Sequence, residues 1–153
     1  VLMHMQGTPR TMQSAPQYAD VVAEVGEFLA QRRDALRARG VAADRIALDP
    51  GFGFGKTPEH NWTLLARLRG LTSLGPVVAG LSRKSMLGHA TGRAVTERVV
   101  ASAAAALVAV QHGATVLRVH DVAATRDALA VLREVQAASQ VRTQREHTSK
   151  QPG

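Results

Sequence analysis

The sequence predicts an α/β fold in which parallel strands alternate with helices. Short apolar runs, each closed by polar or glycine residues, predict buried strands. Between them lie longer segments whose apolar residues recur at helical spacing. Four such strand-helix units follow one another, which favours a parallel sheet with right-handed crossovers. A four-stranded doubly wound sheet and half of a (β/α)8 barrel, which needs about 250 residues, both fit this pattern.

The first unit begins inside a strand, because residues 1–5 are already apolar and the first of them is not methionine. We therefore expect the chain to be an excerpt of a longer protein. The helix predicted at 18–39 has apolar residues at i, i+3, i+4 and i+7, and Gly40 is its natural end. The apolar run 45–49 then predicts the second strand.

The second helix has the clearest start signal in the chain. Thr57 is a suitable N-cap and Pro58 suits the first helical position, with an apolar face that runs to Leu71. The remaining elements repeat the pattern: strand 76–82, a loop rich in glycine and basic residues, helix 96–112, strand 115–120 and helix 124–138.

The length of 153 residues fits one domain or part of one. Residues 1–138 are predicted to form it, and the polar segment 139–153 is predicted to be disordered. The lack of cysteine excludes disulfides and thiolate metal sites and fits a cytoplasmic location. No histidine spacing typical of a metal site is present.

The net charge of +7 raises the question of a nucleic-acid partner. The excess cations gather on the helix 18–39 and in the segment 139–153, without the interleaved aromatic residues that a single-strand binder uses. We therefore predict a solvated helix face and no nucleic-acid partner. The longest apolar run, 99–110, falls short of the roughly 20 residues that span a bilayer, so we predict no membrane partner.

The strand ends carry unusually polar clusters, and ligands of both candidate folds bind beyond the carboxyl ends of the strands. Asp49 ends the second strand, where its carboxylate suits either an aminopyrimidine edge or bracing of the loop. The glycines of 51–55 favour close approach to a ligand. Arg118 and His120 leave the same face of the fourth strand and need an anionic partner, either a ligand or a structural carboxylate such as Asp121.

The third strand ends in Ser82, Arg83 and Lys84, whose hydroxyl and cations suit carboxylate or phosphate oxygens, with a solvated basic loop as the alternative. The segment 51–57 approaches a phosphate loop, but Pro50 occupies the position of its first glycine. A nucleoside triphosphatase is therefore disfavoured, and the glycine spacing also fails for a dinucleotide fold.

Four segments, taken in order, strongly resemble the dihydropteroate synthase family of the bacterial folate pathway. They are Leu2-Met-His-Met-Gln-Gly-Thr-Pro, Leu48-Asp-Pro-Gly-Phe-Gly-Phe-Gly-Lys, Leu81-Ser-Arg-Lys-Ser and Leu117-Arg-Val-His-Asp-Val. The resemblance covers about residues 1–138. It implies units five to eight of a (β/α)8 barrel in a transferase that joins 6-hydroxymethyl-7,8-dihydropterin diphosphate to 4-aminobenzoate, releasing diphosphate.

The resemblance also implies roles for the strand-end residues. Asp49 and Lys84 would bind the pterin, whose pocket Met3 would line. Arg118 and His120 would bind the departing diphosphate, so that Lys84, Arg118 and His120 form the catalytic set.

A second group would hold the other substrate. Ser82 would contact the carboxylate of 4-aminobenzoate, with Phe54 and the stem of Arg83 beside it. Mg2+ is the implied cofactor, with its ligand in the first half of the family's barrel, and homodimers are the implied assembly.

No segment here resembles that first half, with its early asparagine, its mobile Ser-Thr-Arg loop and the residues that complete the pterin pocket. We therefore predict that this chain is inactive alone, since half a barrel also leaves open strand edges. Two alternatives are a pterin-dependent methyltransferase domain and a non-catalytic half-barrel interaction protein.

Overall fold

The computed structural model describes residues 1–8, 10–12 and 15–148, with side chains as far as residue 139. Its strands are β1 (Leu2–Met3), β2 (Leu48–Asp49), β3 (Val78–Ala79) and β4 (Val116–Leu117). Its α-helices are α1 (Val21–Ala38), α2 (Pro58–Ala66), α3 (Ser85–Thr91), α4 (Val99–Gln111) and α5 (Val122–Thr148). Short 3-10 helices occupy Ala43–Arg45, Leu68–Leu74 and Val95–Glu97.

The order of the strands decides between the two predicted architectures. β1 pairs in parallel with β2, where Leu2 lies opposite Leu48, and β3 pairs in parallel with β4, where Val78 lies opposite Val116. A parallel bridge from Leu48 to Val77 joins the two pairs. The strands therefore follow the chain in the order 1-2-3-4, whereas a doubly wound sheet reverses its order at a switch point. Sequential order is the arrangement of a (β/α)8 barrel.

The helix α1 is fixed by its cap and its apolar face. Asp20 caps it by accepting hydrogen bonds from the backbone N–H groups of Val22 and Ala23. Val25 and Leu29 on its inner face are fully buried against β1, α2 and the segment after α2. The helix ends before Gly40, as predicted from the sequence.

The start of α2 also follows the prediction. The Thr57 hydroxyl accepts a hydrogen bond from the backbone N–H of His60, and the His60 ring accepts one from the Thr57 N–H. Pro58 is the first helical residue. The helix ends at Ala66, earlier than predicted, and its apolar face continues through a 3-10 helix.

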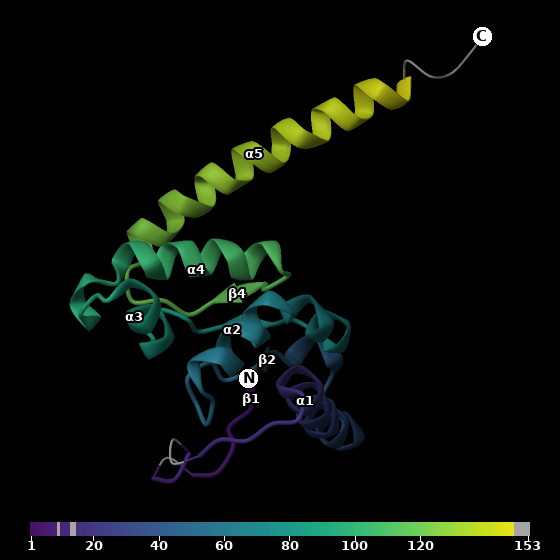
Figure 1. Ribbon diagram of the computed structural model, residues 1–153. Helices are drawn as coiled ribbons and strands as arrows, with labels where there is room; N and C mark the ends of the chain where they lie inside the picture. The colour runs from purple at the N-terminus through teal and green to yellow at the C-terminus, as the bar shows by residue number, and fades with distance from the viewer. Residues whose placement is uncertain (9, 13–14, 149–153) are drawn as a thin grey trace.

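Two helices differ from the sequence analysis. The basic loop predicted after the third strand contains α3, a short helix with only Met86 and Leu87 buried, which gives too few apolar positions for a periodic signal. The prediction of disorder from residue 139 differs from the structure as far as Thr148, because α5 continues to that residue (Figure 1). The segment 139–148 is rich in good helix formers and lacks Gly and Pro, while 149–153 lie outside the described residues.

The helices α4 and α5 pack against each other, with α4 beside β4, and α5 then extends past the rest of the chain (Figure 1). Large exposed apolar side chains on them include Val100, Val131 and Val135. None of the helices within residues 1–8, 10–12 and 15–148 has both the length and the apolar character needed to cross a membrane.

The core can be tested with one substitution made at a buried and at an exposed helical position. Val25→Ala should lower the free energy of unfolding by about 2 kcal/mol, because it leaves a cavity in the core. Val100→Ala, at a side chain that is 81% exposed, should change it by less than about 0.5 kcal/mol. Urea denaturation of both variants measures the difference, and equal effects would contradict this packing.

Candidate functional site

The carboxyl ends of the strands surround one cavity of about 410 Å³. Its lining consists of Met3, Phe54, Gly80, Ser82, Lys84, Arg118, Val119 and His120. Of the residues singled out from the sequence, only Asp49 and Arg83 do not line it. Side chains from four separate strand ends therefore converge on one space, as ligand sites of parallel α/β proteins do.

Asp49 is fully buried and does not line the cavity, but it is hydrogen-bonded to Arg118, which does. One carboxylate oxygen accepts a hydrogen bond of 2.8 Å from the backbone N–H of Gly51, and the other accepts one of 2.8 Å from Nη2 of Arg118. The sequence analysis left open whether Arg118 pairs with a structural carboxylate, and it does so with Asp49. Asp121 has a different partner. A ligand that binds Asp49 therefore has to share its carboxylate with Arg118 or replace Arg118 there.

Gly80 lets Arg118 reach Asp49. A Cβ added at Gly80 would lie 2.7 Å from Nη2 of Arg118 and 3.3 Å from its guanidinium carbon. The guanidinium therefore crosses directly over the backbone of the third strand segment, at a point where only glycine leaves room.

Ser82 and His120 join the ends of the third and fourth strand segments. The Ser82 hydroxyl oxygen accepts a hydrogen bond of 3.2 Å from the backbone N–H of His120 and lies 2.9 Å from Nδ1 of its ring. Ser82 is buried, whereas His120 is exposed and lines the cavity. The two predicted anion-binding side chains are therefore held in fixed relation to each other.

Arg83 is not among the residues that line the cavity. Its Nε and Nη2 atoms donate hydrogen bonds of 3.2 and 2.8 Å to the carboxylate of Asp121, and these hold the pKa of Asp121 below its ordinary value. The backbone of Arg83 is left-handed, with φ 60°, and its N–H donates to the Ser102 hydroxyl. Its predicted place beside 4-aminobenzoate stays a prediction.

Lys84 and Phe54 form one wall of the cavity together. The Lys84 ammonium lies 4.1 Å from the centre of the Phe54 ring, within the range of a cation-π interaction. Burial, and then the charge of Arg118, lower the pKa of Lys84 below its ordinary value. The wall therefore combines an aromatic face with a cation.

His4 and Lys56 form a buried pair behind this wall, and neither was among the predicted site residues. The Nζ atom of Lys56 lies 2.9 Å from Nδ1 of His4 and donates hydrogen bonds to the carbonyl oxygens of Gly51 and Phe54. Burial lowers the pKa of Lys56 to about 8. Burial, followed by the charge of Lys56, lowers the pKa of His4 to about 4. Both residues lie in quoted motifs, but no sequence pattern indicates their burial.

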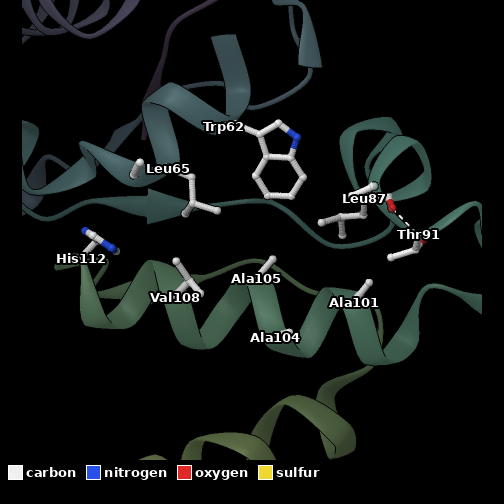
Figure 2. Close-up of a pocket in the computed structure, with 11 residues that line it drawn as sticks. Trp62, Leu65, Leu87, Thr91, Ala101, Ala104, Ala105, Val108 and His112 are labelled. Atoms are coloured by element: carbon white, nitrogen blue, oxygen red, sulfur yellow. Dashed lines mark hydrogen bonds between the residues drawn. The ribbon is translucent and has the colours of Figure 1, made fainter. Parts of the chain in front are cut away.

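A second cavity of about 400 Å³ lies between α2, α3 and α4 (Figure 2). Trp62, Leu65 and Leu87 face Ala101, Ala105 and Val108 across it. Its polar side chains are Thr91, whose hydroxyl donates to the Leu87 carbonyl, and His112. This cavity lacks the convergent charged groups of the strand-end cavity, which is therefore the candidate site.

Comparison with known proteins shows the family of the chain. A family model described as pterin binding enzyme matches residues 1–120. The dihydropteroate synthase of Haemophilus influenzae is 51% identical over 131 residues, covering 85% of this chain and 48% of that protein. The crystal structure of the dihydropteroate synthase from Stenotrophomonas maltophilia, with imidazole in its active site, is 57% identical with a TM-score of 0.86, covering 89% of this chain and 52% of that one.

The dihydropteroate synthase of Burkholderia cenocepacia, complexed with 7,8-dihydropteroate, is 53% identical with a TM-score of 0.83, covering 90% of this chain and 52% of that one. The chain thus spans about half the length of the relatives it matches.

The close passage of Arg118 over Gly80 predicts a large cost for one added methyl group. Gly80→Ala should lower the free energy of unfolding by about 2 kcal/mol, because the Cβ displaces Arg118 and leaves the buried Asp49 without its cation. Gly70→Ala is the matched control, since its Cβ would meet only a Val22 methyl at 3.8 Å. Urea denaturation measures both, and the cost of Gly80→Ala should shrink in an Arg118→Ala background.

The lowered pKa of His4 predicts sensitivity to acid. Between pH 6.5 and about 4 the unfolded chain binds a proton at His4 while the folded chain does not, so stability is lost as the pH falls through this window. The loss should reach at most about 3 kcal/mol. His4→Asn should flatten this part of the pH profile, whereas His89→Asn, at an exposed histidine, should leave it unchanged. Urea midpoints measured from pH 4 to 7 would reveal a contradiction if His4→Asn kept the full slope.

Proposed function

Because the chain belongs to the family of pterin-binding enzymes, we propose that residues 1–138 are the C-terminal half of a dihydropteroate synthase barrel. The enzyme is a transferase of folate biosynthesis that joins 6-hydroxymethyl-7,8-dihydropterin diphosphate to 4-aminobenzoate. The observation that carries the proposal is the strand-end cavity, where cations, a hydroxyl and an aromatic ring converge above a buried carboxylate. The relative crystallised with 7,8-dihydropteroate supports the choice of product.

Asp49 and Lys84 bind the pterin in this proposal, with Met3 beside them. The hydrogen bond of Asp49 to Arg118, which lines the cavity, supports a role for its carboxylate in accepting hydrogen bonds from the amino-pyrimidine edge. Its present partner Arg118 is 56% exposed, so the guanidinium has room to turn toward a ligand while the pterin takes over its hydrogen bond.

The second substrate binds at the other wall. Ser82 contacts the carboxylate of 4-aminobenzoate, and the Phe54 ring and the stem of Arg83 flank its ring. The roles of Ser82 and Phe54 are supported by the fact that both residues line the cavity. For Arg83, the ion pair with Asp121 fixes the guanidinium and leaves the aliphatic stem as the part available for contact.

The reaction displaces diphosphate from a methylene carbon. The amine nitrogen of 4-aminobenzoate forms the new C–N bond, the electron pair of the breaking C–O bond moves onto diphosphate, and the nitrogen loses a proton. Negative charge grows on the leaving oxygens, so preorganised cations lower the barrier. Lys84, Arg118 and His120 have this role in the proposal, which is supported by their place in the lining of one cavity.

Mg2+ is the proposed cofactor of the whole enzyme. The part of the chain that the structure describes has no group of three or more His, Cys, Asp or Glu able to hold a metal ion. Asp49 and Asp121, the carboxylates at the strand ends, are each paired with an arginine. These residues do not fit a magnesium site by themselves. The proposed roles of this chain's residues therefore do not depend on a bound metal ion.

The proposed assembly is a homodimer in the cytoplasm, with small molecules as ligands and without nucleic acid. Exposed apolar side chains on α4 and α5, among them Val100, Val131 and Val135, support pairing of these helices with a second copy. The lack of cysteine supports the cytoplasmic location.

Because this chain is about half as long as its relatives, we predict that it is inactive alone and that activity needs the other half. A coupled synthesis assay should detect no turnover for residues 1–153 alone, because the relatives are about twice as long. The full-length protein that contains this chain should be active, and adding a separate first-half fragment to this chain should restore turnover. In the full-length protein, Arg118→Met should lower kcat by about a hundredfold or more, since it removes a cation from the leaving group.

Turnover by the 153-residue chain at the rate of the full-length protein would contradict the division. A full-length protein that makes no dihydropteroate would refute the proposed function, and methyl transfer to a corrinoid would then identify the methyltransferase alternative.

A further inference from the structure

The loop between β2 and α2 is held tightly although it contains no regular secondary structure. Gly51, Gly53 and Gly55 have φ values of 71°, 77° and 62°. A Cβ at Gly51 would overlap the carbonyl oxygen of His4, and one at Gly55 would lie 2.5 Å from that of Gln6. The glycines therefore let the loop press against the segment that follows β1.

Lys56 supplies the polar contacts that fix this loop from its inner side. The side chain is only 3% exposed. Its Nζ has acceptors at the end of β1 (His4 Nδ1, 2.9 Å), at the start of the loop (Gly51 O, 3.1 Å) and at its tip (Phe54 O, 3.1 Å). An ammonium carries three N–H donors, so each of them has a protein acceptor.

The loop tip in turn forms part of the cavity. The Phe54 ring lies over the Lys84 ammonium, and both residues line the strand-end cavity. Lys56 does not line it, and its donors are engaged within the protein. Its one hydrogen bond to a residue that lines the cavity is the bond to the Phe54 carbonyl, which is therefore the direct route from Lys56 to a ligand.

We propose that Lys56 is a positioning residue, whose ammonium form holds the loop 51–55 so that Phe54 stays over Lys84 and forms the wall of the ligand cavity. The identity of the ligand, 4-aminobenzoate, rests on the function proposed above. The hold of Lys56 on the loop involves only contacts within this chain and does not depend on that function. Lys56 thus acts on binding through the loop.

The charges around Lys56 make its proton dependent on pH near neutrality. Asp49 at the end of β2 favours the ammonium, while Lys84 before α3 opposes it. His4 faces it with a ring nitrogen, and the ring of Tyr18, whose hydroxyl donates to the Gly55 carbonyl, has its centre 6.0 Å from Nζ. Burial outweighs the attraction of Asp49 and places the pKa of Lys56 at about 8.

Loss of this proton should loosen the loop. A neutral amine has two N–H donors and a lone pair, so one of its acceptors would face a lone pair instead of a proton. The hold on the loop therefore weakens as the pH rises through about 8.

Global stability responds to the same proton in the opposite sense. Between pH 8 and 10.5 the unfolded state binds more protons at Lys56 than the folded state does, so its contribution to stability rises with pH. A lysine that only stabilises the fold would therefore not weaken ligand binding as the pH rises through 8, whereas a positioning lysine would.

The first experiment measures KM for 4-aminobenzoate and kcat from pH 6.5 to 9.5 in the full-length protein. Lys56→Met should raise KM about tenfold at pH 7, the equivalent of one hydrogen bond, while kcat changes less. The wild-type KM should rise above pH 8, and that rise should be absent in Lys56→Met. Arg45→Met removes an exposed cation before β2 and should behave as wild type.

A wild-type KM in a folded Lys56→Met variant, or a rise above pH 8 that persists in it, would overturn the proposal.

The second experiment reads the loop without synthase activity. The full-length protein is labelled with fluorophenylalanine, and the Phe54 signal is assigned with Phe54→Leu. In the wild type this 19F signal should shift with a midpoint near pH 8, and this shift should be absent in Lys56→Met, where only the Lys84 ammonium remains beside the ring, while the signal of the buried Phe52 stays constant. A Phe54 signal that does not change from pH 6.5 to 9.5 would refute the positioning role even if Lys56→Met fails to fold.

The two readouts separate the two proposals. A Phe54 signal that titrates in a protein without synthase activity would support the positioning role and refute the proposed function. Synthase activity together with a Phe54 signal that does not change with pH would support the proposed function and refute the positioning role.

Discussion

The buried carboxylate of Asp49 is the constraint on which the arrangement of the site depends. A charge without exposure to water costs several kcal/mol unless it is paired and hydrogen-bonded. Its two oxygens meet this requirement with the Gly51 N–H and the Arg118 guanidinium. The first contact starts the turn of the glycine loop, and the second draws the end of the fourth strand segment across Gly80 to the end of β2. One carboxylate therefore ties the end of β2 to the end of the fourth strand segment, across the third.

The same carboxylate is outnumbered by the cations around it. Lys56, Lys84 and Arg118 all act on each other or on Asp49, and burial lowers the pKa of both lysines. Positive charge held in place at this edge without an equal number of carboxylates favours an anionic ligand. The cost of gathering these cations is met during folding, so they need little rearrangement when an anion binds.

The sequence predicts the parts of this site that depend on residue type and order, and misses those that depend on packing. Thr57 was identifiable as a cap because capping needs only local chemistry. Asp49 was identifiable because a carboxylate that ends an apolar strand is unusual. The partners of Arg118 and Arg83 could not be identified from the sequence, because residue type and order do not say which arginine pairs with Asp49 and which with Asp121. The burial of His4 and Lys56 depends on how the loop folds back on β1, which no periodicity reports.

The division of the barrel explains why binding groups and catalytic power need not lie in the same half. Within the described strands, β1 and β4 each pair on one side only, and Arg118 and Met3 at the cavity remain partly open to water. Cations attract an anion even in water, but the attraction falls several-fold as the local dielectric constant rises. A half barrel can therefore hold the groups that select the ligand while solvent weakens their effect on the transition state. Closure by further strands would strengthen the same contacts without changing any residue of this chain.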